Sequence, residues 1–396
     1  MRFVYALLLM LFIGCSFKKT IDESLPVLDL SKNYPVRTVV LSDIADIDYV
    51  ALETTNSSLL TGYTSSFFVS DKHIVTYDIP SGDIFVFRRN GKFLHKINHK
   101  GNGGEEYIQL NLVVAFDTEE FFVYDRPRDR FLVYSFNGSF IRSFSIDGKG
   151  VELYPLYDYD RDYLIGYNNF YTYETKRCED EHPFYLISKK DGTKTPLNLN
   201  IQKRISDVLA TELIDLGGGQ CYVDQPSLPI FPLLKNGSDY LIAEYALDTL
   251  YSFTDGRLIP IAKQTPSVFS TEPPVIVAPN LFTDSYLQFR IIPIYYDVSN
   301  SFKPFDEAPV LIWNRHTDQI EKWEIYKTDY GTDKVYNELP DTWIEYPYDR
   351  NTGISFYSAE HIIERYKEGK LSGKLLEIAP NLKEDDNIIL EIVKYR

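Results

Sequence analysis

Two stretches of the sequence repeat each other and decide the fold: His73–Ile97, HIVTYDIPSGDIFVFRRNGKFLHKI, and Glu120–Phe144, EFFVYDRPRDRFLVYSFNGSFIRSF. They align without a gap at an offset of 47 residues and are identical at seven of 25 positions. The identical residues include Asn90-Gly91 and Asn137-Gly138, which are strong hairpin signals because both residue types tolerate positive φ. The chain therefore contains an internal repeat of β-hairpins.

One repeat contains four short stretches typical of strands, separated by turn residues. These are Phe67–Ser70, His73–Tyr77, Asp83–Phe87 and Phe93–Ile97. Four antiparallel strands in a unit of this length are typical of one blade of a β-propeller.

Weaker copies of the third strand, turn and fourth strand recur later in the chain. Their turns are Lys190-Asp191-Gly192, Thr254-Asp255-Gly256 and Arg315–Asp318. A further blade can be built from Asp46–Leu52 and Asn387–Tyr395, so that both ends of the chain close the ring. We predict an all-β fold: a single six-bladed β-propeller of four-stranded antiparallel blades. Seven blades are the alternative, because the long insertions could contain another one. Ser358–Glu368 is predicted to be a helix that Ser358 caps.

The first residues have the pattern of an export signal. Met1-Arg2 is followed by the apolar run Phe3–Ile13, which is too short to span a bilayer, and then by Gly14-Cys15. This pattern resembles a bacterial lipobox. We therefore predict a lipoprotein signal peptide at 1–14, lipid attachment at Cys15, a tether at 15–36 and the propeller at 37–396. The alternative is an ordinary secretory signal with an incidental cysteine.

The residues after Cys15 bear on its destination. Ser16 in place of Asp favours the outer membrane, and the basic pair Lys18-Lys19 favours the periplasmic side over the cell surface. The net charge of −16 argues against nucleic acid and against electrostatic adsorption to anionic lipid. The expected partners are the membrane, through the lipid anchor, and a protein or a glycan. The propeller is expected to be a monomer.

Two cysteines remain after Cys15. Cys178 and Cys221 can form a disulfide in an oxidising compartment or stay as two separate thiols. The six histidines show no metal-ligand spacing, and no cofactor motif is present, so no catalytic, metal or cofactor residue is predicted. Asp158, Asp160 and Asp162 imitate the start of a calcium loop, but the later ligand positions do not fit, and a strand is favoured.

Candidate binding residues lie in three loops that a propeller places on one face: Ile79–Gly82, Asn98–Ile108 and Arg126–Asp129. The functional interpretation is a binding loop at the mouth of the central channel. The alternative is a blade connector whose side chains make structural hydrogen bonds. The candidates are His99, Lys100, Glu105, Glu106, Tyr107, Arg126 and Arg128.

Aromatic residues make up 15% of the chain, and most are expected to fill the layers between blades. The others, including Trp343, Tyr346 and Tyr348, could stack on sugar rings or on a partner.

Several segments carry a family resemblance. Tyr49–Thr55 with Ser57–Leu60, Gly101–Tyr107 and the closing stretch Asp385–Leu390 resemble motifs of the six-bladed β-propeller lipoproteins of Bacteroidota. This is a family of unknown function related to NHL-type propellers. The resemblance implies a fold and a compartment but no activity.

We therefore expect a non-catalytic binding or protein-interaction module. The alternative is an enzyme of the lyase, lactonase or glycosidase type that acts on a carbohydrate or peptide at the channel mouth. Several converging His, Asp or Glu side chains would favour the enzyme, and mixed polar and aromatic groups would favour the binding module.

Overall fold

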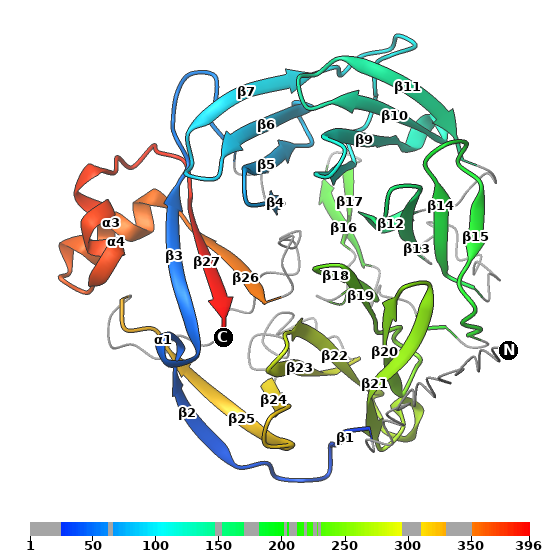
Figure 1. The fold of residues 1–396 in the computed structure, drawn as a ribbon, viewed down its shortest axis with the longest axis vertical. Coiled ribbons are helices and arrows are strands. Elements are labelled where there is room, and N and C mark those ends of the chain that lie inside the picture. Colours follow the sequence, from blue (N-terminus) through cyan, green and yellow to red (C-terminus); the bar gives the residue numbers. More distant parts are fainter. Residues whose placement is uncertain are drawn as a thin grey trace, which may run out of the picture.

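Six small sheets form a ring in the computed structural model (Figure 1). The structure describes residues 25–61, 66–146, 153–169, 182–201, 204–205, 212–217, 220–224, 228, 231–294, 310–329 and 351–396. The six-bladed β-propeller predicted from the repeats is confirmed.

Blades 1 to 3 each contain four antiparallel strands in sequence order, with the first strand innermost (Figure 1). Blade 1 consists of β4 (Phe67–Val69), β5 (His73–Asp78), β6 (Asp83–Arg88) and β7 (Phe93–Asn98). Blade 2 consists of β8 (Leu112–Ala115), β9 (Glu120–Asp125), β10 (Arg130–Ser135) and β11 (Phe140–Ser145). Blade 3 consists of β12 (Leu153–Asp158), β13 (Tyr163–Asn168), β14 (Phe184–Ser188) and β15 (Lys194–Pro196).

Blades 4 and 5 follow the same order but gain a fifth, outer strand from the N-terminal segment. Blade 4 consists of β18 (Leu233–Asn236), β19 (Asp239–Ile242), β20 (Thr249–Thr254) and β21 (Arg257–Thr265). Blade 5 consists of β22 (Val275–Phe282), β23 (Tyr286–Pro293), β24 (Val310–Asn314) and β25 (Gln319–Tyr326). The added strands are β1 (Val27–Asp29), parallel to β21, and β2 (Val36–Val40), parallel to β25.

The two N-terminal strands, β1 and β2, form a belt along the outer edges of blades 4 and 5. The predicted tether at 15–36 is therefore too long. Residues 27–36 do not all belong to a linker, because β1 and the start of β2 are hydrogen-bonded into the ring. Covering the outer edges of blades 4 and 5 protects strand edges that would otherwise be open to pairing with another chain. The propeller therefore begins about ten residues earlier than predicted.

Blade 6 joins the two ends of the chain, as predicted. Its described strands are β26 (Thr352–Tyr357), β27 (Ile389–Tyr395) and β3 (Ala45–Ala51), which follows the short helix α1 (Leu41–Ile44). Between β26 and β27 lie α3 (Ala359–Lys367) and α4 (Gly373–Ile378) at the rim (Figure 1). The predicted helix cap is confirmed: the Ser358 hydroxyl accepts a hydrogen bond from the His361 amide at 3.2 Å.

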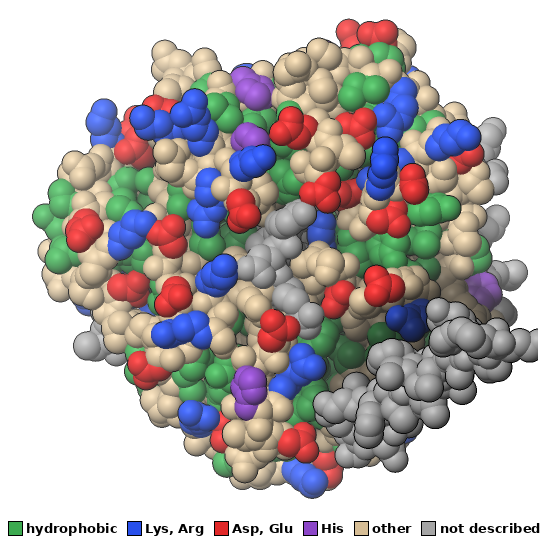
Figure 2. Space-filling view, viewed as in Figure 1, with side chains coloured by type: hydrophobic (Ala, Val, Ile, Leu, Met, Phe, Trp, Pro, Cys, Tyr) green, Lys and Arg blue, Asp and Glu red, His purple; other side chains and the backbone are tan. Residues whose placement is uncertain are grey.

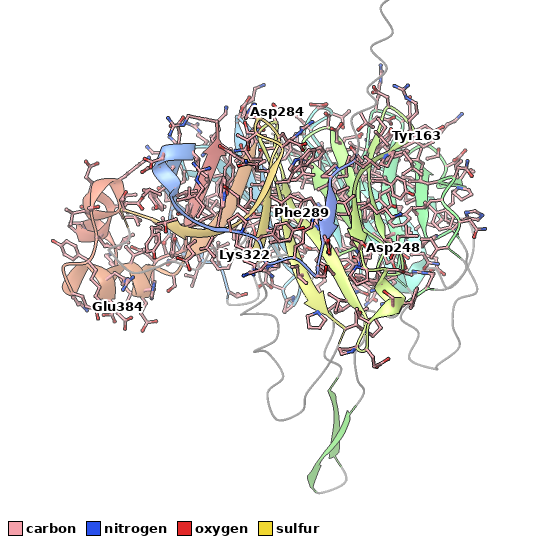
Figure 3. The ribbon with its side chains drawn as sticks, turned by 90° about the horizontal axis from the view of Figure 1, so that it is seen from below. Tyr163, Asp248, Asp284, Phe289, Lys322 and Glu384 are labelled. Atoms are coloured by element: carbon pink, nitrogen blue, oxygen red, sulfur yellow. The ribbon has the colours of Figure 1, made fainter. Side chains whose placement is uncertain are left out.

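Two insertions differ from the expectations. The long connection between blades 3 and 4 contains a separate hairpin, β16 (Glu212–Gly217) and β17 (Gln220–Asp224), which projects from the ring and is not a seventh blade (Figure 3). The segment from Asp158 to Asp162, predicted as a strand, is a turn: β12 ends at Asp158 and β13 begins at Tyr163.

The core consists of layers between the blades. Among the described residues, a cluster of buried apolar side chains lies at each junction, including the junction of blades 6 and 1 that closes the ring. Most of the largest fully buried side chains in these layers are phenylalanine and tyrosine. Burial at about 25 cal/mol per Å² of apolar surface makes these layers the main stabilising contribution. The aromatic excess thus serves largely as filling, as predicted.

The repeated Asn-Gly turns also have a tertiary role. Gly91 and Gly138 have φ values of +84° and +88°, which favour glycine. A Cβ atom on Gly91 would overlap the carbonyl oxygen of Ala51, in the outer strand of the preceding blade. Each of these two turns therefore packs against the blade before it.

None of the helices in the described part of the chain is long and apolar enough to cross a membrane.

Candidate functional site

The three loops that the sequence places on one face do come together. The Lys100 ammonium donates a hydrogen bond to the carbonyl of Pro80 at 2.5 Å, and the Tyr107 hydroxyl donates to the carbonyl of Gly82 at 2.6 Å. Arg128 donates to the carbonyl of Glu106 at 3.0 Å. The loops therefore form one connected surface between blades 1 and 2.

Most of the side chains predicted to bind a ligand there make contacts within the loops and the blade instead. The imidazole of His99 stacks on Tyr134 with ring centroids 4.7 Å apart. The Glu106 carboxylate accepts the amide of Gly103 at 2.8 Å, while Glu105 and Arg126 are exposed. These contacts are those expected of the connector alternative, and a binding role for this loop stays a prediction.

A large cavity lies on the opposite face, at the mouth of the central channel. Its volume is about 940 Å³, and it is formed mainly by the turns between the first and second strands of blades 1 to 4. This face is toward the reader in Figure 2, which shows acidic and basic side chains next to each other around its middle. The lining residues are Asp71, Asp117, Thr118, Asp158, Tyr159, Asp160, Arg161, Lys189, Lys235, Gly237, Ser238, Tyr240 and Lys394.

The deepest charged groups of this cavity are Asp158 and Lys189. Their side chains form an ion pair with a distance of 2.5 Å between Oδ1 and Nζ, and the Lys189 side chain is only 6% exposed. The Lys189 ammonium also donates to the carbonyl of Asp160 at 2.5 Å. A second ammonium, that of Lys235, lies 3.4 Å from the carbonyl oxygen of Asp158. Lys189 therefore pairs with the carboxylate of Asp158, and Lys235 lies at the backbone carbonyl of the same residue.

Burial dominates the electrostatics of Asp158. It raises the pKa of this carboxyl above its ordinary value, and the ammonium groups of Lys189 and Lys235 oppose the rise. The Oδ1 atom of Asp158 is buried and accepts no well-directed hydrogen bond from the described residues, although Lys189 lies close by.

The tyrosines at the cavity are part of its wall. The ring of Tyr159 packs 5.5 Å from Tyr240 and 5.3 Å from Phe253, and the Tyr240 hydroxyl donates to the carbonyl of Asp158. The Asp160 carboxylate accepts the amides of Asp162 and Tyr163 and so shapes the turn. Within the described ranges, no three His, Cys, Asp or Glu side chains lie close enough together to hold a metal ion.

Sequence reasoning did not find this cavity, because its lining residues come from five different blades. The only local signal was the run of aspartates from Asp158 to Asp162. Several other residues singled out from the sequence, namely Cys15, Cys178, the side chain of Cys221 and the aromatic group 343–348, lie outside what the structure describes.

The comparisons with known proteins identify the family. A family model for a domain of unknown function, DUF4934, matches residues 25–394. The chain belongs to this family. The match begins just before β1, in agreement with the inclusion of the N-terminal belt in the propeller. No curated protein matches the sequence.

Solved structures similar to this DUF4934 propeller include two from Bacteroides species. A protein from Bacteroides fragilis that is described as exported has a TM-score of 0.62 at 14% identity, with 93% of this chain and 99% of that chain covered. This likeness shows the fold alone. A member of the DUF4221 family from Bacteroides vulgatus has a TM-score of 0.49 at 10% identity, covering 89% and 98%. A virginiamycin B lyase from Staphylococcus aureus has a TM-score of 0.35 at 11% identity, covering 75% and 77%.

Proposed function

We propose that this protein is a lipoprotein of the cell envelope whose propeller binds a polar ligand in the channel-mouth cavity without transforming it. The observation that carries the proposal is the pair of buried charges, Asp158 and Lys189, at the bottom of a cavity of about 940 Å³. Ligand cavities are commonly about 300–1,000 Å³ and hold a few convergent polar groups. Both properties are met here.

The location forms the second part of the proposal. The apolar run ending at Gly14-Cys15 supports export and lipid attachment at Cys15, on the outer membrane and facing the periplasm. A related propeller fold that is described as exported adds support. With β1 beginning at Val27, the tether from Cys15 is about a dozen residues long and spans at most about 40 Å. The propeller would therefore stay close to the membrane.

Two matched double variants test which face binds. D71N/R161Q changes exposed charges at the cavity, and E105Q/R126Q changes exposed charges on the loop-rich face. The full-length protein and both variants are applied to a glycan array and used for pull-downs from envelope extracts. We expect D71N/R161Q to lose the captured ligand and E105Q/R126Q to retain it.

The opposite pattern, or equal capture by both variants, would show that the cavity is not the binding site. The chemical state of the captured ligand tests the other half of the proposal. A ligand released with a broken or rearranged bond, seen by mass spectrometry, would contradict a binding role and indicate an enzyme.

A further inference from the structure

The channel-mouth cavity continues outward into a side groove. This groove has a volume of about 250 Å³ and lies between blades 6 and 1. Asp71 and Lys394 line both the cavity and the groove, so the two form one elongated depression on the same face of the ring, which we call the extended site. The other described residues that line the groove are Asp46, Ile47, Asp48, Val69, Ser70, Arg89, Thr352 and Ile392.

A row of three polar side chains crosses blade 6 in the groove. Lys394 of β27 lies directly opposite Thr352 of β26 on one side and Asp46 of β3 on the other. Cross-strand neighbours point to the same face of a sheet. Because adjacent strands are about 4.8 Å apart, the row is about 10 Å long. It runs past Lys394, which also lines the cavity, to the outer strand of the blade.

The three side chains of this row differ in their hydrogen-bonding chemistry. The Asp46 carboxylate accepts, the Lys394 ammonium donates, and the Thr352 hydroxyl does both. Asp46 is well placed to meet a ligand, because its side chain is 75% exposed. Hydroxyl groups of a ligand both donate and accept, so they can pair with each kind of group in the row. The groove therefore suits a ligand with many hydroxyl groups.

The charges of the extended site are nearly balanced. Its described lining contains six aspartates and five lysine or arginine side chains. Some of these charges are paired within the protein: Asp158 with Lys189 at 2.5 Å, and Asp46 with Arg396 at 3.8 Å. Acidic and basic side chains also lie next to each other around the middle of this face (Figure 2). A ligand with a net charge would meet repulsive as well as attractive groups, so the site favours a neutral ligand.

The groove offers side chains instead of a free strand edge. Extended peptides are commonly bound by main-chain pairing with an exposed edge of a sheet. At the row, however, β27 is already paired with β26 on one side and β3 on the other. In the cavity, the half-buried ring of Tyr159 adds a surface that is apolar with a polar tip and suits the C–H faces of a sugar ring. An oligosaccharide is therefore favoured over a peptide.

From this shape and lining, we propose that the extended site binds a neutral oligosaccharide, with one end of the chain in the cavity and further sugar units along the groove between blades 6 and 1. This inference rests on the proposed binding function of the cavity and names its ligand class. Asp46 and Arg89 line only the groove, so they contact only a chain long enough to leave the cavity.

Isothermal titration calorimetry on the mature full-length protein tests the ligand class and its length. The probes are the disaccharides and hexasaccharides of the cellulose, xylan, mannan, galactan and chitin series, together with hexaalanine. We expect at least one hexasaccharide to bind at least about tenfold more tightly than its disaccharide, because the groove adds hydrogen bonds. Absence of binding by every hexasaccharide, equal affinities for the two lengths, or tighter binding of hexaalanine would overturn the proposal.

A double variant separates the groove from the cavity. D46A/R89A should weaken the hexasaccharide about tenfold and leave the disaccharide unchanged, because only the longer chain reaches the groove. The matched control is K367A/E384A, which removes an exposed ion pair away from the extended site and should bind both lengths like the wild type. An equal loss for both lengths, or no loss for the hexasaccharide, would contradict the role assigned to the groove.

The outcomes also separate this inference from the proposed function. If D71N/R161Q abolishes capture of the natural ligand while no oligosaccharide binds, the ligand class is wrong and the cavity remains the binding site. If capture survives D71N/R161Q, the proposed function itself is wrong.

Discussion

Tyr49 and Glu391 are direct cross-strand neighbours in the pair of strands that closes the ring, and the Tyr49 hydroxyl lies 3.1 Å from the Glu391 carboxylate. Glu391 is 1% exposed and also receives the Lys327 ammonium at 2.5 Å and the Ser355 hydroxyl at 2.5 Å. The junction between the two ends of the chain is therefore held by a buried polar network as well as by strand pairing.

Removing Glu391 should destabilise the closed ring. E391A leaves the Lys327 ammonium buried without its carboxylate, which costs about 3–5 kcal/mol. Urea unfolding followed by tryptophan fluorescence measures the change. The matched control is E384A, because the Glu384–Lys367 pair is exposed and such pairs contribute about 0–1 kcal/mol. Equal effects of the two variants would contradict a special role for the buried network.

The glycine turns provide a second test of how blades pack. Gly91 and Gly256 both have positive φ, of +84° and +70°, so alanine at either position costs about 1–2 kcal/mol of backbone strain. Only at Gly91 does the added Cβ overlap a neighbour, the carbonyl of Ala51, whereas Gly256 has open space. G91A should therefore lower the free energy of unfolding clearly more than G256A. Similar values from chemical denaturation would show that the turn does not need to approach blade 6 closely.

The stability of the protein should depend on pH through Glu244. Burial raises the pKa of its carboxyl from 4.5 to about 7, and Arg204, at 3.6 Å, only partly opposes this. The folded state therefore binds a proton more tightly than the unfolded state does. This contribution to stability is fully present below about pH 4.5 and is lost as the pH rises toward 7, by up to about 3 kcal/mol.

The test compares wild type with E244Q at pH 4.5 and pH 7.5. The difference between their free energies of unfolding should change over this range, because glutamine does not titrate. A variant at an exposed residue, E360Q, should show no such change. A difference between wild type and E244Q that is independent of pH would contradict the raised pKa.

Lipid attachment makes a prediction about location. C15A should move the protein from the membrane fraction to the soluble fraction, because acyl chains on Cys15 would supply most of the membrane affinity. Fractionation and immunoblotting measure the shift, and C178A serves as a cysteine control that keeps the anchor. Membrane retention of C15A would refute the lipoprotein assignment.

The remaining cysteines can be assigned by chemical labelling. If Cys178 and Cys221 are paired, alkylation of the unfolded mature protein without reductant labels neither residue. Reduction before alkylation should then add two labels, which mass spectrometry counts. Two labels without reductant would show that both thiols are free.

Much of the fold could be read from local chemistry. Asn90-Gly91 and Asn137-Gly138 predict hairpins because positive φ is a property of the residues themselves. The repeat of 47 residues reveals the blade because each blade has the same alternation of strands and turns. Ser358 likewise caps its helix through a contact that spans only three residues. These features depend on neighbours in the chain.

The candidate site depended on contacts that no local pattern records. Asp117, Asp158, Lys189 and Lys235 belong to blades 2, 3 and 4 and meet only when these blades pack side by side. The parallel pairing of β1 with β21 likewise joins segments more than 200 residues apart, without a turn to announce it. The sequence by itself thus determined the repeating blade and the joining of the two ends, because both follow from local turn chemistry and strand patterns. Only the tertiary structure decided which face holds the cavity, because the charges of that cavity converge through the packing of blades around a common axis.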